Sequence, residues 1–185
     1  MTHSDLATPL EGCLNRYRLA LAAPLPEPVA DAARRALVDW FAVGISGMQD
    51  PEARALAGYV RLWQTRGHSP TLDGERLAPV AAALVNGAAA HTLDFDDFHI
   101  ASLLHPGAPT YAAVLALGYG QRQSGERMLA AFAAGFEVGA WCGLDGVGEQ
   151  LAQRGWHPTS ILGQTQGSVD SLKRLVEFNP MFSSC

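Results

Sequence analysis

The feature that most constrains this chain is a helical hydrophobic pattern whose segments begin at proline and end at glycine. Pro26 and Pro28 precede the first strong segment, which runs until Gly44 and Gly47. Its apolar positions recur at spacings of three and four: Val29, Ala33, Ala36, Leu37, Trp40 and Phe41. This pattern predicts an amphipathic helix, which must bury its apolar face against other helices.

Four further segments of the same kind follow. Asp50 and Pro51 predict the N-cap and first residue of a second helix, which we expect to end at Gly67. The other helices are expected at residues 78–93, 109–120 and 124–143. Residues 67–74 are rich in turn formers and are expected to form an exposed loop. Because strand signals are weak, we predict an all-α fold in which no sheet exceeds two short strands.

Composition narrows the class of protein. With 48% hydrophobic and 17% charged residues, the chain of 185 residues is expected to be globular. A net charge of −5 without a basic cluster argues against nucleic acid or an anionic membrane as a partner. The start of the sequence, Met1 to Asp5, shows no basic region followed by an apolar run, so we expect no secretory signal. No apolar run reaches the roughly 18 residues of a membrane span, and we expect a cytoplasmic protein. The three cysteines, Cys13, Cys142 and Cys185, are expected to be reduced thiols rather than disulfide partners or zinc ligands.

The character of the chain changes near its carboxy-terminal end. The run from Gln164 to Gly167 interrupts the alanine-rich pattern. We therefore predict a helical domain over residues 1–163 and a divergent tail over 164–185. Within the tail, residues 168–178 are expected to form one short helix, and the last residues are expected to be frayed.

An acidic run follows the third expected helix. Asp94, Asp96 and Asp97 lie within four residues of one another. On a continuing helix His91, Asp94 and Asp97 would share one face, and Asp96 would point elsewhere. Carboxylates in the last turn of a helix are disfavoured by its dipole, so a cation, backbone N–H groups or raised pKa values must compensate. The run is either a solvated acidic helix end or part of a functional site.

Two histidine–proline pairs precede expected helix starts. His105–Pro106 follows His99, and His157–Pro158 comes directly before Thr159 or Ser160, either of which could be the N-cap. The positive end of a helix binds anions and lowers the pKa of a nearby histidine, which keeps the imidazole neutral and able to act as a base. One such pair is commonly structural, but two pairs beside an acidic run favour a site.

Taken in order, these motifs resemble the MmgE/PrpD family. The matching runs are residues 39–47, 82–87, 91–97, 104–109, 134–138 and 154–159. The resemblance covers roughly residues 15–163. It implies a large all-helical domain, a smaller α/β lid domain and a homodimer.

The resemblance also implies a chemistry. Members such as 2-methylcitrate dehydratase, cis-aconitate decarboxylase and iminodisuccinate epimerase act on small polycarboxylates without a metal or an organic cofactor. They transfer a proton beside a carboxylate, and elimination, decarboxylation or re-protonation follows. We therefore expect a cofactor-free lyase that acts on a small di- or tricarboxylate.

The family motifs imply roles for individual residues. Asp94, His105 and His157 match the positions that carry catalysis. The expected substrate contacts are His91, Asp97, Phe98, His99 and Arg154. Phe98 stands where relatives commonly have threonine, so a hydroxyl that could bind substrate is missing and the identity of the substrate stays open.

This chain differs in length from the family that it resembles, because the members of that family are more than twice as long. The later lysines and tyrosine of the family pocket and the lid have no counterpart here, so we expect an incomplete domain, through a truncated gene, a frameshift or a fragment. The alternative is a catalytically inactive helical remnant that serves as a binding or dimerisation module.

Two metal-dependent classes are disfavoured. The spacing of Asp94, Asp96 and Asp97 is similar to an aspartate-rich Mg²⁺ motif of isoprenoid enzymes, but no second such motif follows. A ferritin-like site needs Glu-x-x-His pairs on two helices, and the sequence has none. We expect no metal site.

Overall fold

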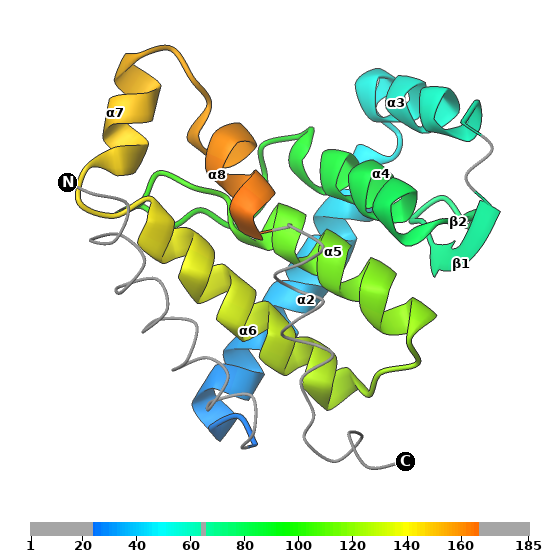
Figure 1. Cartoon of the computed structure of the whole chain (residues 1–185), viewed down its shortest axis with the longest axis horizontal. Helices are drawn as coiled ribbons and strands as arrows, with labels where there is room; N and C mark the ends of the chain where they lie inside the picture. The colour runs from blue at the N-terminus through cyan, green and yellow to red at the C-terminus, as the bar shows by residue number, and fades with distance from the viewer. Residues whose placement is uncertain (1–23, 64–65, 167–185) are drawn as a thin grey trace, which may run out of the picture.

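The computed structural model describes residues 24–63 and 66–166, with side chains up to residue 163. In this part of the chain the helices are α2 (Glu27–Gly47), α3 (Pro51–Arg61), α4 (Pro79–His91), α5 (Gly107–Gly120), α6 (Gly125–Cys142), α7 (Val147–Gln153) and α8 (Pro158–Gln166). One antiparallel hairpin joins β1 (Arg66–Pro70) to β2 (Arg76–Leu77) (Figure 1). The prediction of an all-α fold with no sheet beyond two short strands is confirmed for these residues. The helix expected at 168–178 and the last residues of the tail lie outside the described residues.

Proline and capping side chains set the starts of α2, α3 and α6 as predicted. Pro26 occupies the N-cap position of α2, with Pro28 in its first turn, and the helix runs to Gly47. The Asp50 carboxylate accepts a hydrogen bond of 2.8 Å from the Glu52 N–H and so caps α3. Ser124 caps α6, because its hydroxyl accepts from the backbone N–H three residues later at 3.3 Å. These local contacts explain why the sequence pattern located the helices.

The centre of the molecule is the packing of α4 against α5, with α2 crossing both (Figure 1). Alanine and glycine allow this close approach: a Cβ at Gly47 would lie 1.9 Å from the Ala89 carbonyl oxygen. The buried Trp40 indole donates a hydrogen bond of 3.2 Å to the Ala108 carbonyl. These contacts fix the first turn of α5, and thereby the loop that precedes it.

The hairpin corrects one prediction. Residues 67–74 were expected to form an exposed loop, but β1 includes the first four of them and Ser69 is fully buried. The Ser69 hydroxyl donates to the Ala116 carbonyl on α5 at 2.6 Å, which ties the strand to the core. In addition, α3 ends at Arg61 rather than at Gly67. Pairing between the strands overrides the turn-forming residues.

Two further differences concern the helices. Val29 and Phe41 were expected on the apolar face of α2, but both are exposed, whereas Ala33 and Trp40 are buried. The short helix α7 was not predicted, and it begins after Gly146, whose φ is +79°. Among the described residues there is no α/β lid domain.

None of the described helices is long and apolar enough to cross a membrane by itself. The pair α6 and α7, with a bend of 62° between them, passes that test of length and composition when taken together.

Candidate active site

The loop between α4 and α5 directs the side chain of Asp96 into the interior of the protein. The helix ends at His91, and the backbone at Asp94 then has φ +53°, a left-handed conformation that aspartate adopts more readily than most residues. After this turn Phe95 is exposed, and the side chain of Asp96 is only 2% exposed. The predicted helical face shared by His91, Asp94 and Asp97 is therefore wrong, because the helix ends before those carboxylates.

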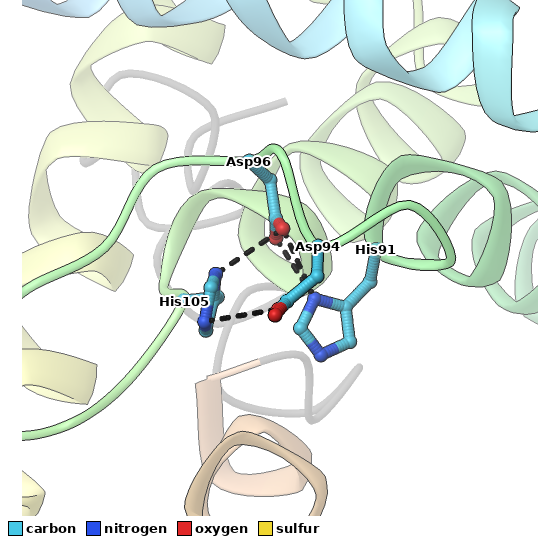
Figure 2. A group of neighbouring side chains, drawn as sticks. All are labelled: His91, Asp94, Asp96 and His105. Atoms are coloured by element: carbon cyan, nitrogen blue, oxygen red, sulfur yellow. Dashed lines mark hydrogen bonds and ion pairs between the residues drawn. The ribbon is translucent and has the colours of Figure 1, made fainter.

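Asp96 lies at the centre of the site. The Nδ1 atom of His91 lies 3.0 Å and 3.2 Å from its two carboxylate oxygens. The Nδ1 atom of His105 lies 3.1 Å from Asp96 Oδ1, and the Nε2 atom of the same ring lies 3.5 Å from Asp94 Oδ1 (Figure 2). One buried carboxylate thus contacts two imidazoles, and one imidazole lies between two carboxylates.

A third imidazole comes from the far end of the chain. His157 directly precedes α8, and the centroid of its ring lies 5.2 Å from that of His91 and 6.4 Å from that of His105. The structure thus brings together Asp94, His105 and His157, the three residues predicted to be catalytic. Their catalytic role remains a prediction.

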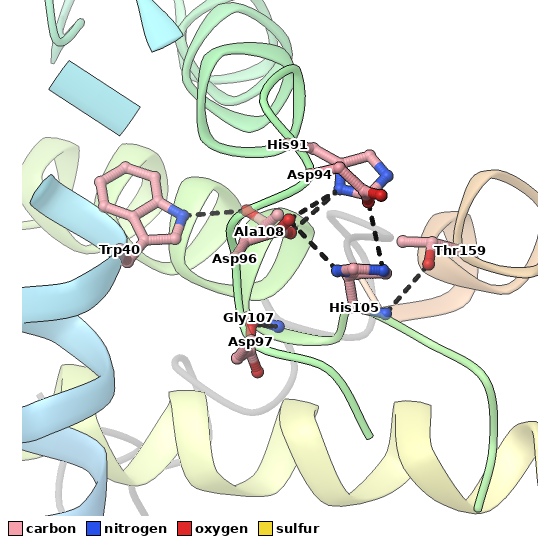
Figure 3. Close-up of polar contacts among 9 residues, drawn as sticks. All are labelled: Trp40, His91, Asp94, Asp96, Asp97, His105, Gly107, Ala108 and Thr159. Carbon is pink, nitrogen blue, oxygen red and sulfur yellow. Dashed lines mark hydrogen bonds and ion pairs between the residues drawn. The ribbon is translucent and has the colours of Figure 1, made fainter. Parts of the chain in front are cut away.

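A hydrogen bond joins the two histidine–proline segments. The buried hydroxyl of Thr159 accepts from the backbone N–H of His105 at 3.0 Å (Figure 3). Because α8 begins at Pro158, His157 precedes the helix and neither Thr159 nor Ser160 is its N-cap, which corrects the sequence prediction. Thr159 instead fixes α8 to the loop that carries His105.

Asp97 points away from the histidines (Figure 3). Its Oδ1 atom accepts a hydrogen bond of 2.9 Å from the backbone N–H of Gly107, at the start of α5. A Cβ at position 107 would lie 2.2 Å from that oxygen, so only glycine permits this contact. Burial raises the pKa of Asp97 to about 6. The contacts indicate that Asp97 anchors the helix, and its expected contact with substrate remains a prediction.

Of the other residues predicted to contact substrate, Phe98 packs against His105, whereas within the described part of the chain His99 and Arg154 have no recorded contact with the histidines of the site. The ring of Phe98 packs 5.0 Å from that of His105 and is half exposed. His99 lies with its Nδ1 atom 2.8 Å from the Ser102 hydroxyl, within its own loop. Arg154 is exposed just beyond α7, and no ion pair recorded among the described residues includes it.

The surroundings shift two of the imidazoles in opposite directions. The hydrogen bond with Asp96 raises the pKa of His91. Partial burial lowers the pKa of His157, and the neighbouring His91 and His105 lower it further. His91 therefore retains its proton to higher pH, whereas His157 is neutral at pH 7. Titratable neighbours whose pKa values diverge in this way suit the roles of acid and base.

Comparison with known proteins identifies the family. The family model of the MmgE/PrpD N-terminal domain matches residues 20–179. The chain belongs to the MmgE/PrpD family. The match continues past residue 163, where the motif resemblance ended, so the boundary of the tail remains a prediction.

Several relatives of this MmgE/PrpD chain are decarboxylases by name. A cis-aconitate decarboxylase-like protein of Aspergillus oryzae, oryM, is 30% identical over 159 residues, which are 82% of this chain and 33% of that protein. The cis-aconitate decarboxylase of Aspergillus terreus is 27% identical and that of Mus musculus 30% identical, each covering 82% of this chain and 32% of the relative. The chain thus spans about a third of the length of the relatives it matches.

The motif analysis of this MmgE/PrpD chain missed two features. Asp96 belongs to the acidic run, but helical spacing directed it away from His91. Nor did the spacing indicate how close four possible ligand atoms lie: His91, Asp94, Asp96 and His105 each offer one atom within 4.8 Å of the others. Both features arise from the turn at Asp94, which sequence spacing does not encode.

Proposed function

We propose that this chain provides the proton-transfer site of a cofactor-free lyase that acts on a small di- or tricarboxylate. The observation that carries the proposal is the meeting of three imidazoles and two carboxylates: His91, Asp94, Asp96, His105 and His157. Membership of the MmgE/PrpD family supports it.

The chemistry of such lyases needs a base and an acid within reach of one small molecule. Decarboxylation of an unsaturated acid breaks the bond to CO₂ and places a proton on carbon. Dehydration removes a proton from carbon and gives one to the departing hydroxyl, and epimerisation removes a proton and returns it. General acid–base groups of this kind typically contribute about 10²–10⁴-fold to a rate.

The contacts suggest a division of work. His157 is the base, because it is neutral at pH 7 and exposed to an incoming ligand. His105 is held in orientation by carboxylates on both sides of its ring and delivers a proton. The exposed Asp94 lies beside both the ring of His105 and the solvent, where it can also meet substrate. The start of α8, as the positive end of a helix, suits one substrate carboxylate.

The names of the relatives decide which substrate to test first. Three of them are cis-aconitate decarboxylases or are named as similar to one, so cis-aconitate is our first candidate substrate. The further candidates are 2-methylcitrate and iminodisuccinate, which other members of the family use. A homodimer in the cytoplasm remains our expectation for the working enzyme.

The experiment is a turnover assay of the protein as its own gene encodes it. Proton NMR would follow each of the three substrates, with His157→Ala and His105→Ala as variants and His68→Ala as the matched control on β1. We expect turnover that survives dialysis against EDTA, falls at least about 100-fold in the two site variants and is unchanged in the control. A folded, helical protein that converts none of the three substrates would contradict the proposal.

One observation favours a second function, a binding or dimerisation module without catalysis. An open groove of about 810 Å³ runs beside His91, between α3, α4, α5 and α8, and most of its lining is apolar. Val80 and Leu84 on its rim are exposed. Exposed apolar surface of this kind commonly marks an interaction site. Lack of turnover in the assay above would favour this alternative.

A further inference from the structure

We propose that His91, Asp94, Asp96 and His105 form a binding site for a divalent transition-metal cation of the Zn²⁺ type, and that the bound cation blocks proton transfer. One ligand atom from each residue lies within 4.8 Å of the other three (Figure 2). The cation-binding part stands on these four residues alone, whereas the blocking part rests on the proposed function.

The donor set selects the class of cation. Two imidazole nitrogens and two carboxylate oxygens suit a four-coordinate Zn²⁺ site, whereas Mg²⁺ and Ca²⁺ prefer sites made of oxygen alone. With metal–ligand distances of about 2.0–2.2 Å, ligand atoms in a tetrahedral site lie about 3.4 Å apart. Asp96 Oδ1 lies 3.2 Å from His91 Nδ1 and 3.1 Å from His105 Nδ1, which is close to that spacing. The 3.5 Å contact of Asp94 is with Nε2, the other nitrogen of the His105 ring, so Asp94 would have to turn toward the first three atoms.

The pairs of ligand atoms that lie up to 4.8 Å apart must approach each other by about an ångström to bind one ion, and the exposed side chain of the cluster can move that far. The side chain of Asp94 is 76% exposed, so its carboxylate can rotate without disturbing the core. Asp96 and His105 are held more firmly, since their side chains are 2% and 12% exposed. Asp96 and His105 thus offer two fixed ligands, and the carboxylate of Asp94 can adjust to a bound cation.

The charge and hydrogen bonding of the cluster also favour a cation. The Nδ1 atom of His105 is buried and makes no hydrogen bond, although it lies 3.1 Å from Asp96. Buried polar atoms without a hydrogen bond are uncommon. Among the described residues, neither Asp94 nor Asp96 pairs with an arginine, so histidines alone accompany the two negative charges.

A cation here would occupy His105, the imidazole that delivers a proton, together with its neighbour His91. Metal ligation requires unprotonated nitrogen, so a bound ion takes the lone pairs that His91 and His105 would use for protons. His157 does not belong to the four ligands. The base therefore stays unligated while its neighbours are bound, and the expected effect is inhibition that chelation reverses.

The test measures binding in the absence of substrate. Residues 1–185, dialysed against EDTA, would be titrated with ZnCl₂ by calorimetry and with CoCl₂ by visible absorption, which reports four-coordinate geometry. We expect one equivalent of Zn²⁺ to bind with micromolar affinity. The affinity should fall at least about tenfold in His91→Ala, Asp96→Asn and Asp94→Asn. His68→Ala, outside the cluster, should bind as the parent does.

The outcomes test the cation site and the inhibition separately. Absence of saturable Zn²⁺ binding would overturn the site, and so would binding that persists unchanged in Asp94→Asn, whose exposed side chain can be changed without unfolding the core. Zn²⁺ should also lower the turnover of the gene-encoded enzyme, and EDTA should restore it. Binding with undiminished turnover would overturn the blocking effect, whereas lack of any turnover without Zn²⁺ would count against the proposed function and not against the cation site.

Discussion

At the scale of single residues, Asp96 organises the candidate site. Its buried carboxylate contacts His91 and His105, which are separated by the whole loop between α4 and α5. The sequence indicated that His105 and His157 would meet, through their positions before helices and through the family motifs. It could not indicate Asp96, because helical spacing applies only while the helix continues, and the left-handed turn at Asp94 ends that relation.

Asp97 provides a prediction about stability at this scale. Burial raises its pKa to about 6, so between roughly pH 4 and pH 6 the folded chain holds a proton that the unfolded chain has lost. The protonated Asp97 side chain therefore contributes fully to the free energy of unfolding below about pH 4, and this contribution is lost as the pH rises through about 6. Asp97→Asn can still accept from the Gly107 N–H, and we expect it to raise the free energy of unfolding at pH 7 by about 1–2 kcal/mol.

Urea unfolding at pH 5 and pH 7 would measure this effect. The exposed Glu149→Gln is the control for loss of a negative charge, and we expect it to change the free energy of unfolding by less than about 0.5 kcal/mol. An Asp97→Asn variant less stable than the parent at pH 7 would show that the charged carboxylate stabilises the fold.

At the scale of elements, the helix boundaries were predictable where one side chain determines them. Pro28, Asp50 and Ser124 act through contacts within their own first turns, so α2, α3 and α6 follow from local sequence. The hairpin was not predictable in this way. Its buried Ser69 is held by Ala116 on α5, a contact between distant parts of the chain that replaces the turn expected from residues 67–74.

Thr159 supplies the prediction that belongs to elements, because its hydroxyl joins α8 to the loop before α5. In Thr159→Val the shape of the side chain is retained, but the backbone N–H of His105 loses its acceptor. A partly buried donor left unpaired costs about 1–3 kcal/mol, so we expect the free energy of unfolding to fall by about that amount. Urea unfolding would measure the loss.

The matched control for that variant is Thr159→Ser, which keeps the hydroxyl and loses only a methyl group. We expect it to be more stable than Thr159→Val. Equal stability of the valine and serine variants would mean that the hydrogen bond does not hold the two elements together.

At the scale of the whole molecule, the described part of the chain lacks cations where a polycarboxylate would bind. The ion pairs of Arg34, Arg35 and Arg61 all lie away from the histidine cluster, and Arg154 makes none among the described contacts. Unpaired charges are costly to desolvate, and the start of a helix offers only about half a positive charge. Under the proposed function, we expect the substrate to take its cationic contacts from further polypeptide or from a second subunit.

We accordingly expect residues 1–185 by themselves to show little or no lyase activity, even with the histidine cluster intact. The measurement is turnover of cis-aconitate, 2-methylcitrate and iminodisuccinate by the purified chain, followed by proton NMR. Robust turnover that His157→Ala abolishes would show that the cluster needs no additional cations.

If these side chains form one coupled proton-transfer site, as we propose, the titration of each histidine must depend on the others and on Asp96. Proton NMR of the C2–H signals in metal-free residues 1–185, assigned with single His→Ala variants, would give each pKa. We predict that His91 titrates above its ordinary value of about 6.5 and His157 below it, and that Asp96→Asn lowers the pKa of His91 more than that of His157. Titration of both histidines together near 6.5, with no response to Asp96→Asn, would contradict the account.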